Sequence, residues 1–430
     1  MTRLQINRAR RSPFGVKSTL LIGLTLSLLL SCGRTDAVIK SSQSLIQTSC
    51  APAHLAKPIF WDIDSLAKAK SRIDAGDATL TPAYNSLIER ASSALELAPF
   101  SVTHKPQPGP SGDKQDYVSL SRYFWPDPNM KDGLPYIRKD GHSNPEINSK
   151  NFDRRRSQDM ANAIRDLSLA AYFTGDHRYS EQAGKLVYTW FVDKNLRMNP
   201  NLKFAQGVPG KTAGREFGIL DTRIYWDVMD GLLLLQSANM ADAKQVDAVR
   251  HWFKEYSNWL MTSDFGKKAK GKYNNHGTFY DAQLAQSLIF AGQCDLAKKA
   301  LKSGLDRTQK QITSSGLMPG EIDRTRSLFY HAFNAQAFLR MSHLSETLGI
   351  EFYTVRKDDA GSVKDSVYFI ASYAGRTHAW PYEEISSNVE KSIWTMLKYA
   401  QFVDDNAGIE EALERLGYRD SQSYLNLLGG

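Results

Sequence analysis

Residues 154–175 read RRRSQDMANAIRDLSLAAYFTG, a stretch with the period of an α-helix. Small and apolar residues recur in it every three or four positions, at Met160, Ala163, Ile164, Leu167 and Ala171. This spacing predicts a helix with one apolar face. The stretch ends at Gly175, which is typical of a helix that stops at a residue in the left-handed conformation.

The same kind of stop recurs along the chain and predicts a repeat of helical hairpins. Helical patterns end at a Gly or Asn five times, with separations of 64, 53, 57 and 59 residues, at Gly175, Asn239, Gly292, Gly349 and Gly408. A second amphipathic helix follows each stop, seen best at residues 246–260. Because a helix with one apolar face must bury it on a neighbour, the hairpins stack into an all-α fold, either an open α-solenoid or a closed α/α toroid.

One more hairpin is predicted upstream of the repeat. Residues 63–73 and 84–97 have helical spacing, and the second helix begins with Thr81 as its N-cap and Pro82 at its first helical position. No alternating run of useful length predicts a strand.

Two long stretches, residues 101–152 and 197–215, are rich in Pro, Gly and Asn and are predicted to lack helix. Loops of this length in a compact domain are often lids or binding loops. The first stretch carries a dense aromatic run that includes Tyr123 and Trp125. Such a run suits either a surface on which sugars stack or a loop that is pinned to the core.

Composition places the chain among globular proteins and gives no reason to expect a nucleic-acid partner. It has 430 residues, 42% hydrophobic and 23% charged, which is enough apolar material for a large core. The formal net charge is +8, but residues 1–31 hold five basic residues and no acidic one. Without them, 49 basic residues face 46 acidic ones, a balance of +3. Any preference for anions must therefore come from local clusters.

The N-terminus has the order of an export signal. Basic residues precede an apolar run at residues 20–30, which is too short to span a bilayer, and the segment ends Leu-Leu-Ser-Cys-Gly, similar to a bacterial lipobox. We therefore expect a signal peptide at residues 1–31, a tether at 32–56 and a single domain at 57–430. The protein is then periplasmic, attached to the outer membrane through a lipid on Cys32 or secreted in soluble form.

Cysteine spacing gives no metal site. The chain has Cys32, Cys50 and Cys294, without a CxxC motif or a Cys/His pair at zinc spacing. If Cys32 carries the lipid, an oxidising compartment allows a bridge between Cys50 and Cys294, although nothing in the spacing requires one. We expect no cofactor and a monomer.

The starts of the first helices of the hairpins should meet at one mouth of the assembly. They carry residues that bind anions or transfer protons, at Arg154 to Arg156, Asp221 to Arg223, Asn274 to His276, and Arg324 to Arg326 with Tyr330. Helix N-termini add partial positive charge at the same end. This mouth should attract a carboxylate or a phosphate.

An amide, a His, an Arg and a Tyr together suit proton abstraction beside a carboxylate. The C5 proton of a uronic acid becomes acidic only when the charge of the sugar's carboxylate is neutralised, and each preorganised donor contributes roughly 3 kcal/mol. A neighbouring Arg lowers the pKa of a Tyr, so that Tyr330, four residues after Arg326, could take the proton and later protonate the leaving oxygen.

Structural roles compete with each of these assignments. Asn274 to His276 could serve only as an N-cap, Arg154 to Arg156 could be a solvated run of charge, and Tyr330 could belong to the core. Lone histidines are usually structural, so His104, His142, His177 and His331 receive no role.

Six stretches together resemble the alginate lyase superfamily of helical-barrel polysaccharide lyases. They spread over roughly residues 60–405 and are Asp116 to Leu120, Tyr123 to Pro128, Gly133 to Arg138, Asn199 to Leu202, Asn274 to His276, and Arg324 to Ser327 with Tyr330. The resemblance implies an α/α toroid. It also implies metal-independent β-elimination of a 1,4-linked uronan, which leaves a 4,5-unsaturated sugar.

The resemblance assigns roles to single residues. In the family an Asn and an Arg neutralise the substrate carboxylate while a His and a Tyr handle the proton, which here fall on Asn275, Arg324, His276 and Tyr330. The family's alginate-specific branch sets its Arg seven residues before the Tyr, where this chain has Asp323. Arg324 is the nearest replacement and Arg326 the next. Gln206, Arg223, Tyr123 and Trp125 are the remaining candidates for contact with the substrate.

We therefore expect a lyase that acts on an acidic polysaccharide, with alginate first and glucuronan as the alternative polymer. Two rival functions remain. A glycoside hydrolase on the same fold would need paired carboxylates, for which Asp221, Asp281 and Glu321 are candidates. A glycan-binding lipoprotein without catalysis would use the same mouth only for binding.

Overall fold

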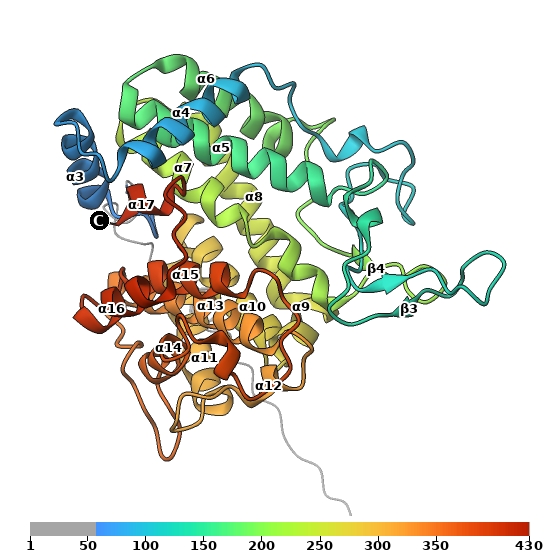
Figure 1. Ribbon diagram of the computed structural model, residues 1–430. Helices are drawn as coiled ribbons and strands as arrows, with labels where there is room; N and C mark the ends of the chain where they lie inside the picture. The colour runs from blue at the N-terminus through green and yellow to red at the C-terminus, as the bar shows by residue number, and fades with distance from the viewer. Residues whose placement is uncertain (1–56, 430) are drawn as a thin grey trace, which may run out of the picture. The chain divides into compact units, whose positions relative to one another are not determined.

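Helices pack in pairs through most of residues 57–429, the part of the chain that the computed structural model describes (Figure 1). The predicted signal peptide and tether lie outside this part. The α-helices are α3 (Ile63–Asp74), α4 (Thr81–Leu95), α5 (Arg154–Thr174), α6 (His177–Val187), α7 (Tyr225–Ser237), α8 (Ala243–Thr262), α9 (Asp264–Lys270), α10 (Asn275–Phe290), α11 (Cys294–Gln311), α12 (Pro319–Ile322), α13 (Ser327–Thr347), α14 (Val363–Ala371), α15 (Val389–Ala400), α16 (Ala407–Leu416) and α17 (Leu425–Leu428).

Five successive pairs each combine one largely buried helix with one that buries a single face. The buried helices α5, α7, α10, α13 and α15 pack on one another in chain order, while α6, α8, α11, α14 and α16 pack outside them. In α10 every residue except His276 is buried. The predicted repeat of helical hairpins is therefore confirmed.

The predicted stops are correct in four cases and wrong in one. Gly175, Asn239, Gly292 and Gly349 all have positive φ directly after a buried helix. Gly408 instead lies in the first turn of α16, because α15 already ends at Ala400. Near the N-terminus the predicted cap is off by one residue, since Leu80 is the N-cap of α4 and Thr81 begins the helix.

The two stretches predicted to lack helix contain no α-helix and carry the four described strands. These are β1 (Val118–Leu120), β2 (Phe124–Trp125), β3 (Ile137–Arg138) and β4 (Phe204–Gly207). β1 pairs with β4 in parallel, so the two stretches join each other, and β2 pairs with β3 in an antiparallel hairpin. The loop between β2 and β3 projects away from the helices in Figure 1. Short 3₁₀ segments lie at Val102–His104, Pro145–Asn148, Glu216–Thr222 and Thr377–Ala379, and a π-helical turn lies at Tyr188–Val192.

A buried ion pair fixes the first described residues to the helices. Asp230 accepts hydrogen bonds from the backbone N–H groups of Ile59 and Phe60, at 2.6 and 2.8 Å. Its other oxygen accepts from Arg340 at 2.9 Å, and both charged side chains are fully buried. The Arg340 guanidinium lies between the rings of Phe60 and Trp226, about 4 Å from each centroid.

Two further expectations concern cysteine and the membrane. Cys294 is disulfide-bonded, and Cys50, the partner that the sequence allows, lies outside the described residues. No helix within residues 57–429 has both the length and the apolar character to cross a membrane.

Candidate active site

The predicted mouth is a cavity of about 470 Å³. All four helix starts that the sequence singled out contribute residues to its lining. The predicted residues that line it are Tyr123, Arg154, Gln206, Asp221, Arg223, Asn274, Asn275, His276, Arg324, Arg326 and Tyr330. Residues more than 200 positions apart therefore meet at one site.

Tyr330 lies between another phenol and a guanidinium. Its hydroxyl is 2.6 Å from the hydroxyl of Tyr123, and the Cζ atom of Arg324 lies 4.1 Å from the centroid of its ring. Asp140 orients Arg324 by accepting hydrogen bonds from Nε and Nη2, at 3.3 and 3.1 Å. The Cζ atom of Arg326 lies 4.2 Å from the centroid of the Phe329 ring, and its guanidinium binds Tyr123, Ser386 and Asn388.

The pKa of Tyr330 contradicts the expectation that a neighbouring Arg lowers it. Tyr330 is only 8% exposed, and burial raises its pKa by more than Arg324 lowers it. The cause is the cost of placing a phenolate in a site shielded from water. Tyr330 is therefore a neutral phenol near pH 7 and is suited to donate a proton.

His276 is a neutral imidazole whose free nitrogen is defined by its neighbour. Burial, followed by Arg324, Arg215 and Lys272, lowers its pKa to about 3. Its Nδ1 lies 3.2 Å from Oδ1 of Asn274, an atom that only accepts hydrogen bonds, so Nδ1 carries the proton. Nε2 remains as the proton acceptor of the ring, which is the form that a general base needs.

Asn275 is anchored by a carboxylate behind the cavity wall. Its Nδ2 donates to Oε1 and Oε2 of Glu321, at 3.1 and 2.8 Å, and its backbone N–H donates to Oε1 at 2.6 Å. Both residues are fully buried. The start of α10 also keeps an N-cap, but Asn274 provides it rather than Asn275.

The cavity carries a large excess of positive charge. Seven arginines line it, at Arg122, Arg138, Arg154, Arg215, Arg223, Arg324 and Arg326, against the single carboxylate of Asp221. Arg154, Arg138 and Arg324 form ion pairs with Asp221 or Asp140. The other four form no ion pair with any carboxylate of residues 57–429. Burial lowers the pKa of Arg223 to about 10, and Arg154 and Arg122 add to the effect, although the carboxylate of Asp221 opposes it.

Two expectations about the site need correction. Trp125 does not line the cavity, since its indole N–H donates to the carbonyl of His142, whereas its neighbour Phe124 does line it. The run Arg154 to Arg156 is divided: Arg155 is exposed and pairs with Asp159, and Arg156 binds Asp153.

Within residues 57–429 the lining of the cavity lacks the pair of carboxylates that a hydrolase would need. Asp221 is occupied by Ser119, Tyr117, Gln206 and Arg154, Asp281 pairs with Arg307, and Glu321 binds Asn275. Of these three acids only Asp221 lines the cavity, whereas a hydrolase needs two carboxylates there.

Sequence reasoning missed several lining residues, including Arg122, Arg138, Arg215, Phe217 and Phe333. Arg122 and Arg138 flank the aromatic run, and this position in the sequence could have identified them as lining residues. Asp140 orients Arg324 although the two residues are 184 positions apart, and no feature of the sequence pointed to this contact.

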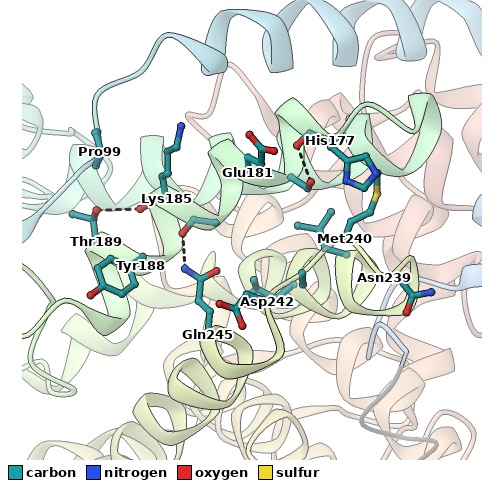
Figure 2. Close-up of a pocket in the computed structure, with 15 residues that line it drawn as sticks. Pro99, His177, Glu181, Lys185, Tyr188, Thr189, Asn239, Met240, Asp242 and Gln245 are labelled. Atoms are coloured by element: carbon teal, nitrogen blue, oxygen red, sulfur yellow. Dashed lines mark hydrogen bonds between the residues drawn. The ribbon is translucent and has the colours of Figure 1, made fainter.

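A larger cavity, of about 730 Å³, lies elsewhere and is lined by none of the predicted catalytic or substrate-binding residues. Figure 2 shows it between α6 and the start of α8, where Gln245 donates a hydrogen bond to the backbone of Gly184. Its charged lining is mixed, with Glu181 and Asp242 beside Lys185. Within residues 57–429 no group of three or more His, Cys, Asp or Glu side chains is arranged to hold a metal ion.

Comparison with known proteins gives both a family match and related structures. A family model described as alginate lyase matches residues 101–380. The crystal structure of an alginate lyase from Bacteroides ovatus is 33% identical, with a TM-score of 0.81, and the match covers 86% of this chain and 98% of that one. No curated protein sequence matches the chain.

Two more distant structures agree on the fold. Alginate lyase A1-III from Sphingomonas species A1 is 15% identical with a TM-score of 0.53, and the match covers 89% of this chain and 99% of that one. A His-to-Ala variant of A1-III in complex with a tetrasaccharide is 14% identical with a TM-score of 0.55, covering 90% and 99%. The helices therefore form an α/α toroid, and the open solenoid is excluded.

Proposed function

The chain belongs to the alginate lyase family and is a polysaccharide lyase, and from this premise we propose that it cleaves alginate by metal-independent β-elimination. One observation carries the proposal. Asn275, His276, Arg324 and Tyr330 line one cavity, and four arginines of this cavity have no carboxylate partner within residues 57–429. A chain of uronates supplies both the reactive acid and the counter-charges.

We propose that Arg324 and Asn275 bind the carboxylate of the sugar that loses its C5 proton. Guanidinium and amide N–H groups favour the charge that develops on this carboxylate as the proton leaves. Nε2 of His276 takes the proton, and the negative sugar beside it raises the low pKa of the imidazole. Arginine and amide donors supply the stabilisation for which other enzymes use a metal ion, so we expect EDTA to leave the rate unchanged.

The Tyr330 hydroxyl then gives its proton to the glycosidic oxygen O4. The C4–O4 bond breaks and the C4–C5 double bond forms, which yields a 4,5-unsaturated sugar and a free hydroxyl on the leaving chain. Exchange with water carries the proton from His276 back to Tyr330. The hydroxyl of Tyr123, 2.6 Å away, and the Arg324 guanidinium stabilise the phenolate in the interval.

A polymer panel tests the proposal. The enzyme is mixed with polymannuronate, polyguluronate, glucuronan and hyaluronan, and the absorbance of the unsaturated product is followed near 235 nm, with and without EDTA, before the products are sized. We expect absorbance to grow fastest on one of the two alginate polymers. An increase in absorbance on glucuronan alone would mean that the substrate is glucuronan rather than alginate, while the proposed reaction would stand. Binding without new absorbance would contradict the lyase mechanism.

The arginines without carboxylate partners predict a second acid group of the substrate in the cavity. Replacing Arg223 by Gln removes one of them, and a hydrogen bond between charged groups contributes about 1.5–3 kcal/mol. We expect KM to rise by about 10- to 100-fold with kcat little changed. Arg155→Gln, at an exposed position outside the cavity, is the matched control and should leave KM unchanged. A fall in kcat at constant KM would place Arg223 in the chemical step instead.

A further inference from the structure

Glu321 is a buried acid whose carboxylate has Asn275 as its only hydrogen-bond partner within residues 57–429. Its side chain is 0% exposed, and Asn275 supplies all three of its hydrogen bonds, through the backbone N–H and Nδ2. No Lys, Arg or His of the described residues forms an ion pair with it. Burying a carboxylate with so little compensation is costly, which indicates a function that uses its proton.

The Asn275 amide faces the wrong way for an anionic ligand. Both of its contacts to Glu321 come from Nδ2, so the donor group points at a carboxylate that is already part of the protein. Oδ1 is buried without a hydrogen-bond partner among the described residues, and Asn275 lines the cavity. We infer that Oδ1 is the atom that meets a ligand. A sugar carboxylate needs an N–H donor there, because two acceptors repel each other.

Rotating the side-chain amide of Asn275 by half a turn exchanges the positions of Nδ2 and Oδ1. Nδ2 then takes the place of Oδ1, and Oδ1 faces Glu321, which must now donate a hydrogen bond. Only a protonated carboxyl group does so, and its second oxygen still accepts from the backbone N–H of Asn275.

We propose that Glu321 is a positioning residue that takes up one proton from solvent when an anionic sugar binds, so that the Asn275 amide turns its N–H groups to the sugar's carboxylate. The inference rests on the proposed function, since it needs a uronate in the cavity. One O–H bond forms on Glu321 and one bond to hydrogen breaks in the buffer acid that gives up the proton. No covalent bond among the heavy atoms of the protein or the sugar changes.

The electrostatics of the site agree with this proposal. Burial raises the pKa of Glu321 to about 7, although Asn275 and Arg324 oppose the rise. A bound carboxylate adds a second negative charge and raises this pKa further. Affinity for the sugar is therefore complete below pH 7 and is lost as the pH rises above it.

Neighbouring groups do not titrate between pH 7 and pH 8.5. The pKa of His276 is about 3, that of His331 about 4 and that of Asp281, which pairs with Arg307, about 6. The pKa values of Tyr330 and Arg324 are raised above their ordinary values. Lys272 pairs with Glu216, whose pKa is lowered.

Calorimetry on the inactive Tyr330→Phe variant measures the proton directly. Binding of a mannuronate tetrasaccharide, with a glucuronate tetrasaccharide in parallel, is recorded in buffers of different ionisation enthalpy. We expect uptake of about one proton per ligand at pH 8 and close to none at pH 6, with Kd rising about tenfold between these pH values.

Adding Glu321→Gln tests the residue itself. The Gln amide donates permanently to Oδ1 of Asn275, so we expect no proton uptake and the same Kd at pH 6 and pH 8. Glu346→Gln, which changes an exposed acid near the other end of α13, should keep the uptake. Uptake that persists in Glu321→Gln would overturn the proposal.

Infrared difference spectra give an answer that needs no Glu321 variant. The Tyr330→Phe protein should gain the C=O stretch of a protonated carboxyl group when either tetrasaccharide binds at pH 8. Tight binding without this band, and without a pH-dependent Kd, would refute the role of Glu321. Failure of both tetrasaccharides to bind would instead refute the proposed function.

Discussion

Tyr330→Phe should lower kcat by a factor of about 10² to 10⁴, the usual contribution of a positioned general acid. The substitution removes one hydroxyl and little contact area, and it leaves Arg324 stacked on the ring. Binding should therefore persist while proton transfer to the leaving oxygen is lost. Initial rates of absorbance growth measure kcat, and calorimetry with a uronate tetrasaccharide measures Kd.

Tyr188→Phe is the matched control for this experiment. Tyr188 is 49% exposed and lies in the larger cavity of Figure 2, away from the proposed site. It should keep full activity. If Tyr330→Phe kept full activity, or if Tyr188→Phe were the inactive variant, the assignment of the catalytic cavity would be wrong.

Asp230→Ala should destabilise the fold by about 3–5 kcal/mol, because breaking a buried ion pair leaves an unpaired charge in the interior. The substitution leaves the Arg340 guanidinium between two rings without its carboxylate partner. It also removes the hydrogen-bond acceptor of the backbone N–H groups of Ile59 and Phe60. Urea titration followed by circular dichroism measures the change in the free energy of unfolding.

Asp359→Ala provides the comparison for this stability measurement, since Asp359 is exposed on a loop. Its free energy of unfolding should stay within about 0.5 kcal/mol of the parent protein. A loss below 1 kcal/mol in Asp230→Ala would mean that water or a neighbouring group compensates Arg340.

Helix periodicity and left-handed stops predicted the repeat of hairpins because both are local. Apolar spacing reports the buried face of a helix, and a Gly or Asn at positive φ reports its end. Gly408 was misjudged for the same reason. A Gly in the first turn of a helix and a Gly just past a helix end look alike until the neighbouring elements fix the boundary.

The helix starts also predicted most of the candidate site. In a stack of hairpins the first helices run in one direction, so their N-termini share one rim, and this argument brought Arg154, Arg223, His276 and Tyr330 together. It could not find Arg215 or Phe217, which reach the cavity from an irregular stretch. The aromatic run predicted Trp125 as a contact for the substrate, but its neighbour Phe124 lines the cavity instead.

The sequence alone determined the helical architecture, the rim that carries the reactive side chains and the resemblance to one family. Only the tertiary structure decided the protonation of Tyr330, the free nitrogen of His276 and the carboxylates behind Arg324 and Asn275. It also decided which cavity arginines have no carboxylate partner within residues 57–429. The physical reason is that periodicity depends on residues a few positions apart. Desolvation and hydrogen bonding depend on atoms a few ångströms apart, and Asp140 and Arg324 become neighbours only when the chain has folded.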